Sequence, residues 1–170
     1  MTVREILTEP NKLLRQISET VEKIGDEERR LMDDMLDTMY AAPGIGLAAI
    51  QIGVAKRIIV MDISRDEIKK EPMYFINPII KNRNNEKAKY EEGCLSVPDQ
   101  FAEIERPNTC EVEYLDYDGK KKLLKADGLL ATCIQHEMDH LEGILFIDYL
   151  SKLKKSIIIK KLSKVKRKIF

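Results

Sequence analysis

Tryptophan is absent from this chain of 170 residues, which also contains only three cysteines and two histidines. Three cysteines without a framework spacing predict reduced thiols in a cytosol-like compartment rather than a disulfide scaffold. No apolar run approaches the ~20 residues that cross a membrane. The N-terminus lacks the basic and apolar segments of a secretory signal. We therefore expect a cytoplasmic protein with no membrane segment. A monomer is also expected.

Hydrophobic residues make up 44% of the chain, which is enough for one sizeable core. We expect a single domain over residues 1–170. The formal net charge is zero, but the charges are unevenly placed. Residues 151–170 hold nine Lys or Arg and no acidic residue, which leaves 20 basic against 29 acidic side chains in residues 1–150. The body is therefore acidic and the tail is basic.

The hydrophobic pattern predicts strands in the middle of the chain and helices at both ends, which is typical of an α+β fold. A cap residue, Ser151, precedes the last helical pattern, and Asp118-Gly119 predicts a hairpin turn. The expected elements, in chain order, are a short helix after Pro10, a helix over 26–41, strands near 57–63 and 72–80, a polar loop over 82–89, strands over 110–117 and 121–125, and helices over 127–141 and from 151 to the end.

The segment GIGLAA, residues 44–49, fits the glycine pattern of a dinucleotide-binding turn. Such a turn needs a strand before the glycines and a helix after them, so that the helix N-terminus meets the pyrophosphate. Here a helical pattern precedes the glycines, and an apolar strand pattern at 57–62 follows too soon for a crossover helix. The order of elements argues against a nucleotide site.

Both histidines lie in the segment QHEMDH, residues 135–140. His136 and His140 are four residues apart on a predicted helix, so their rings leave one face, and Glu137 lies beside them. This HExxH arrangement is typical of zinc hydrolases, although a bare match also occurs on ordinary solvated helices. The preceding run, LLATCI, is too apolar for a surface helix. Buried histidines need partners for their nitrogens, which a metal supplies.

A catalytic metal usually has three protein ligands and an open position for water. Phe146 occupies the third-histidine position of the longer metzincin pattern, so a cysteine is the expected third ligand. Cys133 lies seven residues before His140, about 10.5 Å along the helix axis, and Cys110 lies on the apolar side of a predicted strand. Cys94 follows a glycine that lets the backbone approach closely. Cys94 is therefore the favoured third metal ligand. The alternative is that it is an ordinary half-buried loop cysteine that binds no metal.

Three segments in this order, GIGLAAIQ at 44–51, EGCLS at 92–96 and QHEMDHLEG at 135–143, resemble the signature motifs of the peptide deformylases. The resemblance covers nearly the whole chain. That family consists of metal hydrolases that remove the formyl group from the N-terminal formylmethionine of nascent chains in bacteria and organelles. We accordingly expect an α+β fold of mixed, mainly antiparallel strands around a central HExxH helix, with N-terminal helices and a C-terminal helix.

The resemblance also implies roles for individual residues. The metal would be one divalent ion, Fe(II) in most members, with Zn, Ni or Co able to occupy the site. Its ligands would be Cys94, His136 and His140, Glu137 would be the general acid and base, and Gln51 with the backbone N–H of Leu95 would stabilise the oxyanion. Without the resemblance, a surface position would be the simpler interpretation of Gln51.

The resemblance to the peptide deformylases also suggests which residues contact the substrate. The glycines of GIGLAAIQ let backbone approach an extended peptide, and we expect the substrate main chain to dock at Gly46. An apolar pocket for methionine is expected from Ile45, Tyr90, Leu129, Thr132 and Cys133, of which Leu129 and Cys133 could equally be core. Phe101 departs from the family, many bacterial members of which carry a basic residue at this place.

Three alternatives remain at this stage. A zinc peptidase that cleaves internal amides shares HExxH, a structural metal module would add a fourth protein ligand, and a deformylase-like chain could lack activity.

The basic tail over 151–170 is a further candidate site. Its apolar residues recur at nearly helical spacing, which predicts packing on the body, while its lysines are hypothesised to bind ribosomal RNA. The predicted stripe comprises Leu153, Ile157, Leu162, Val165 and Ile169.

Overall fold

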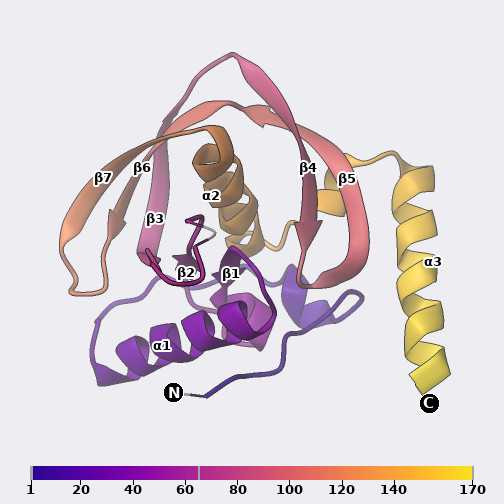
Figure 1. Cartoon of the computed structure of the whole chain (residues 1–170), viewed down its shortest axis with the longest axis horizontal. Helices are drawn as coiled ribbons and strands as arrows, with labels where there is room; N and C mark the ends of the chain where they lie inside the picture. The colour runs from indigo at the N-terminus through magenta and orange to yellow at the C-terminus, as the bar shows by residue number, and fades with distance from the viewer. Residues whose placement is uncertain (1, 65, 170) are drawn as a thin grey trace.

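Two antiparallel sheets lie on either side of one central helix (Figure 1). This computed structural model describes residues 2–64 and 66–169, with side chains described through residue 164. The elements are η1 (Lys12–Arg15), α1 (Asp26–Ala41), β1 (Gly46–Ala48), η2 (Ala49–Ile52), β2 (Ile58–Met61), β3 (Met73–Arg83), β4 (Lys87–Cys94), β5 (Val97–Pro107), β6 (Thr109–Leu115), β7 (Lys121–Asp127), α2 (Gly128–Leu141), η3 (Phe146–Tyr149) and α3 (Lys152–Ile169).

The larger sheet has the strand order β1-β2-β3-β6-β7, and the smaller sheet is the β4-β5 hairpin. Every pairing between these strands is antiparallel. In Figure 1 the orange helix α2 stands between the strands β3, β6 and β7 on the left and β4 and β5 on the right. The α+β class, the antiparallel strands and the central HExxH helix are therefore confirmed. The single domain over 1–170 stays a prediction.

Strand β2 explains why the larger sheet has a core on each face. All four of its residues are buried, and neighbouring side chains of a strand point to opposite faces. Ile58 and Val60 join the methionines of α1 in one cluster, whereas Ile59 and Met61 pack in a second cluster with Ile134 of α2. A continuous apolar run is what a strand covered on both faces requires.

The β4-β5 hairpin corrects one expectation from the sequence. The polar loop expected over 82–89 is wrong, because β3 continues to Arg83 and β4 already begins at Lys87. Along β4 the exposure alternates, with charged side chains on the outer face. Lys, Glu and Asn have low strand propensity, so the composition of this segment concealed two strands whose inner faces are covered by the rest of the molecule.

Helix α2 begins where the sequence predicts, with Asp127 in extended conformation at the N-cap position. Its residues from Ala131 to Glu137 are all buried, as are His140 and Leu141. A helix covered nearly all round is expected when sheets flank it on two sides. The chain then turns at Gly143, whose φ of 71° lies in the left-handed region and follows the helix end as glycine commonly does.

Helix α3 runs beside β5 at one side of the molecule (Figure 1). The Ser151 hydroxyl accepts a hydrogen bond from the Lys154 N–H at 3.3 Å, as a cap residue should. The predicted apolar stripe is wrong in part. Ile158 and Leu162 are the buried residues, whereas Leu153 and Ile157 are 71% and 45% exposed. Val165 and Ile169 lie outside the described side chains. Among the described residues, none of the helices has the length and apolar character needed to cross a membrane.

Gly143 should be intolerant of any side chain. A Cβ atom there would lie 2.7 Å from the backbone carbonyl carbon of Arg15, in addition to the strain of a positive φ. We expect Gly143→Ala to lower the free energy of unfolding in urea by about 2 to 4 kcal/mol.

Gly119→Ala is the matched control, because Gly119 has a φ of 85° but the nearest atom to its Cβ would be a side-chain carbon of Ile24 at 3.5 Å. This control carries the strain of the positive φ without the backbone clash. Equal losses in the two variants would show that contact with Arg15 does not restrict position 143.

Candidate metal centre and active-site cleft

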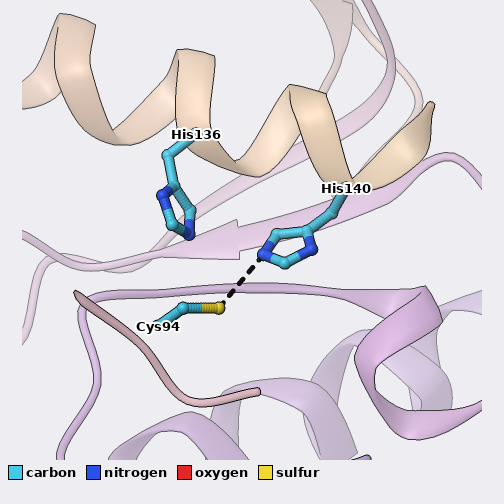
Figure 2. Close-up of side chains that lie close together, drawn as sticks. All are labelled: Cys94, His136 and His140. Carbon is cyan, nitrogen blue, oxygen red and sulfur yellow. Dashed lines mark hydrogen bonds between the residues drawn. The ribbon is translucent and has the colours of Figure 1, made fainter. Parts of the chain in front are cut away.

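Cys94, His136 and His140 bring three metal-ligating atoms together. One ligand atom from each lies within 4.8 Å of the others, and the Cys94 sulfur is 3.3 Å from Nε2 of His140. Figure 2 shows the two rings leaving one face of α2 toward the sulfur at the end of β4. A sulfur and two imidazole nitrogens this close together fit one tetrahedral transition-metal ion, for which ligand bonds are about 2.0 to 2.3 Å.

The position of Cys94 depends on an irregularity in the hairpin. Regular pairing runs as far as Gly93 opposite Phe101, and the register then shifts so that Cys94 pairs with Val97. A shift of this kind bends a strand and re-aims its side chains. It brings the cysteine to the end of β4 that faces α2, where the metal-ligand cluster forms.

Behind the ligands, Glu92 is buried and holds His136 in place. One of its carboxylate oxygens lies 2.9 Å from Nδ1 of His136, and the two oxygens accept hydrogen bonds from the Arg106 guanidinium at 2.7 and 3.0 Å. Burial alone would raise the pKa of Glu92, but these bonds hold it below its usual value. Since Nδ1 is committed to Glu92, Nε2 of His136 is left to face a metal.

Arg106 also links Glu92 to Asp139 on α2 and, through Asp139, to Tyr149 in η3. Its guanidinium donates to Asp139 at 2.9 Å, and the Tyr149 hydroxyl donates to the same carboxylate at 2.7 Å. The sequence motifs include Glu92 but give it no role, and they contain no signal for Arg106. Arg106 lies near Glu92 because β4 pairs with β5, and in that pairing Arg106 is opposite Ala88. This pairing between strands could not be read from the local sequence.

Glu137 lies on α2 between the two histidines and is buried. Its Oε1 is 3.9 Å from Nε2 of His136, and its Oε2 has no hydrogen-bond partner among the described residues. Burial raises the pKa of Glu137 to about 7. Burial also lowers the pKa of His140 well below its usual value, which favours the neutral ring that a metal binds. The site therefore combines a His140 ring held neutral with a carboxyl group able to exchange protons near neutral pH.

Gln51 is buried rather than at the surface. Its side-chain oxygen accepts a hydrogen bond from the Ala48 N–H at 2.9 Å. Its amide nitrogen donates to the Ser96 hydroxyl at 3.0 Å and lies 3.6 Å from the Cys94 sulfur. These contacts orient a neutral donor beside the metal-ligand cluster.

The glycines of GIGLAA make room for the other two motifs. A Cβ atom on Gly44 would be 2.6 Å from a side-chain carbon of Leu95, and one on Gly46 would be 2.8 Å from Oε1 of Glu137. The segment leads into a short strand and a 3-10 helix, β1 and η2, not into a phosphate-binding helix. Close packing against Leu95 and Glu137, not nucleotide binding, accounts for these glycines.

A cleft of about 540 Å³ opens beside the metal-ligand cluster. Cys133 lines it but is not part of the cluster of Cys94, His136 and His140, and burial raises the pKa of its thiol. Cys110 is buried on β6. Most of the residues singled out from the sequence meet at this cleft, namely Ile45, Gly46, Gln51, Tyr90, Cys94, Leu95, Leu129, Thr132, Cys133, His136 and Glu137, with Phe101 at its rim.

Known proteins match this chain over nearly its whole length. A peptide deformylase of Pelagibacter ubique is 86% identical over 166 residues, covering 98% of this chain and 96% of that protein. A peptide deformylase of Phenylobacterium zucineum is 59% identical, covering 96% and 97%.

A solved structure of a peptide deformylase also matches this chain over nearly its whole length. The crystal structure of the Ehrlichia chaffeensis peptide deformylase in complex with actinonin superposes with a TM-score of 0.93 at 48% identity, covering 98% of this chain and 99% of that one. The sequence model of the family described as polypeptide deformylase matches residues 3–156. With the Cys94, His136 and His140 cluster and the buried Glu137 in place, the chain belongs to the polypeptide deformylase family, the hydrolases that remove N-formyl groups from nascent polypeptides.

Proposed function

We propose that this chain hydrolyses the formyl group from N-terminal formylmethionine and releases formate, with the residue roles given below. The observation that carries the proposal is the cluster of Cys94, His136 and His140 with the buried carboxyl of Glu137 beside it, at one wall of the cleft. We further propose a monomeric enzyme that acts in the cytoplasm, where formylated chains emerge from ribosomes.

Cys94, His136 and His140 would hold one divalent ion and leave a fourth position open. Such an ion, when bound, would polarise the formyl carbonyl and lower the pKa of water. A thiolate with two imidazoles suits several first-row metals. We propose Fe(II) as the physiological ion, with Zn, Ni or Co able to replace it.

Glu137 would act as the general base and then the general acid. Its pKa, raised by burial to about 7, makes both protonation states accessible near neutral pH. The carboxylate would take a proton from the attacking water and return it to the nitrogen of the leaving amine. Because Gly46 has no Cβ, its backbone can lie close to this carboxyl, which limits the positions that Glu137 can take.

Gln51 and the backbone N–H of Leu95 would stabilise the oxygen of the tetrahedral intermediate. The hydrogen bonds from Ala48 and to Ser96 fix the amide of Gln51 in advance, so no reorganisation is needed as charge develops. Leu95 follows directly after Cys94 and lines the cleft, which gives its N–H access to the same region.

The substrate would bind as an extended strand. β1 is an edge strand of the larger sheet, and within the described residues β4 pairs with β5 alone, so both offer free backbone groups to a peptide. We propose that the main chain docks at Gly46. The methionine side chain would enter the apolar part of the cleft, which is lined by Ile45, Tyr90, Leu129, Thr132 and Cys133.

Glu137→Gln tests the proposed chemistry. The variant should bind metal at the wild-type stoichiometry but lose about 10² to 10⁴-fold in formate release from formyl-Met-Ala, because an amide cannot accept the proton of water. Glu142→Gln is the control, since Glu142 lies just past the same helix and contacts Arg57 instead of the cleft. Formate release retained by Glu137→Gln would remove Glu137 from this role. The wild type should leave an unformylated peptide uncut, and cleavage of it would favour an internal peptidase.

The cysteines should differ in their effect on metal content. Cys94→Ala removes one of three clustered ligand atoms and should abolish stoichiometric metal binding after dialysis, whereas Cys110→Ala and Cys133→Ala should retain it. Elemental analysis of the three purified variants measures this directly. Metal loss in Cys133→Ala, with Cys94→Ala unaffected, would reverse the ligand assignment.

We also propose that helix α3 attaches the enzyme to ribosomal RNA. Its inner face packs on the body through Ile158 and Leu162. Lys160, Lys161 and Lys164 are all exposed. Lys168, which belongs to the same basic tail, lies outside the described side chains. A row of cations that neutralises phosphates releases counterions, so such binding weakens steeply as salt rises.

Changing Lys160, Lys161, Lys164 and Lys168 to Gln should lower ribosome affinity and its salt dependence, while formyl-Met-Ala hydrolysis stays nearly unchanged. Co-sedimentation with ribosomes at two salt concentrations measures both. The control changes Lys87, Lys120, Lys122 and Lys125 to Gln, which removes the same charge from exposed lysines elsewhere. Equal co-sedimentation of all three proteins would reduce the tail to a packing helix.

A further inference from the structure

Phe101 is a large apolar side chain in an unusual place. It lies on β5 at the rim of the cleft, yet it is 65% exposed. The cores of the protein do not account for it, because none of the three buried clusters includes it. Among the exposed apolar side chains of the described residues, this ring lines the cleft, where it is available to contact a bound ligand.

The ring is held against the backbone of β4. Phe101 pairs directly with Gly93, and a Cβ atom on Gly93 would lie 2.6 and 2.7 Å from two ring carbons. The ring therefore occupies the space that a side chain at position 93 would fill. Any larger residue at position 93 would displace it. Gly93 and Phe101 together form one surface, which we call the Phe101 platform.

The platform lies on one face of β4, and the metal centre lies on the other. Neighbouring strand residues point to opposite faces, and Glu92, the residue before Gly93, points inward to His136. Phe101 shares the face of Gly93, because directly paired residues of antiparallel strands lie on the same side. The outer face of β4 at this point thus carries an aromatic ring instead of a charge.

A peptide that adds to the free edge of β4 must follow the same alternation. If the methionine side chain points inward to the pocket near Tyr90 and Cys133, the next side chain points outward. The Phe101 platform lies on that outer face, at the Gly93 end of β4. Exposed acidic residues, Glu91 and Glu103, pair with each other on the same face, so an acidic side chain would be repelled there.

We propose that the Phe101 platform binds the side chain of the residue that follows formylmethionine, and that it selects large apolar residues over glycine and aspartate. The inference rests on the proposed function of the cleft. Phe101 is a specificity-determining residue in this scheme and takes no part in proton transfer or metal binding.

Formate release from a series formyl-Met-Xaa-Ser, with Leu, Phe, Gly or Asp as Xaa, tests the proposal. The wild type should give kcat/KM values about 3- to 10-fold higher for Leu and Phe than for Gly, as expected for one aromatic or aliphatic contact on a ring, and lowest for Asp. Phe101→Ala should reduce the Leu to Gly ratio to about 1. Phe101→Leu, which keeps an apolar surface of smaller area, should retain part of the ratio.

Leu123→Ala is the matched control, because Leu123 is a 57% exposed apolar residue on β7, away from the cleft lining. It should leave the ratio unchanged. A wild type with equal rates for all four peptides would overturn the proposal even if a Phe101 variant failed to fold, and so would an unchanged ratio in a folded Phe101→Ala. Absence of formate from every peptide would instead refute the proposed function of the cleft itself.

Discussion

The metal centre depends on the buried carboxylate of Glu92, which lies between His136 and Arg106. Removing two charges from water is costly, and the cost is recovered only where every oxygen and N–H finds a partner. Here the guanidinium uses two nitrogens on Glu92 and one on Asp139. The ion pair therefore joins the β4-β5 hairpin to α2 and fixes the ring of one ligand. Loss of a single partner would leave the other charge buried, which typically costs about 3 to 5 kcal/mol.

The sequence predicted those parts of the fold in which periodicity reflects burial directly. Helix α1 was found because its methionines recur on one face, and they do pack on the sheet. Strand β2 was found because covered strands are apolar throughout. The ligand pair on α2 was found for a similar reason, since four-residue spacing on a helix places His136 and His140 one turn apart whatever surrounds them. Local geometry alone carries each of these inferences.

Features that depend on pairing between distant segments could not be predicted. The charged strand β4 resembled a loop, because its stability comes from β5 and from its covered inner face. Arg106 lacks a local signal, since its partners Glu92 and Asp139 lie 14 and 33 residues away. The face that α3 buries was misjudged for the same reason. Leu153 and Ile157 fit a helical stripe as well as Ile158 does, and only the position of β5 decides between them.

The three residues of the metal-ligand cluster come from segments that are far apart in the sequence. Cys94 belongs to the hairpin, whereas His136 and His140 belong to a helix more than forty positions further on. An ion bound to all three would act as a cross-link between two layers, comparable to a disulfide in closing a long loop of chain. Because an unfolded chain offers no such arrangement, each ion bound favours the folded state by mass action. The thermal stability of this enzyme would then depend on the free metal concentration around it, so metal supply would govern how long the protein survives as well as how fast it works.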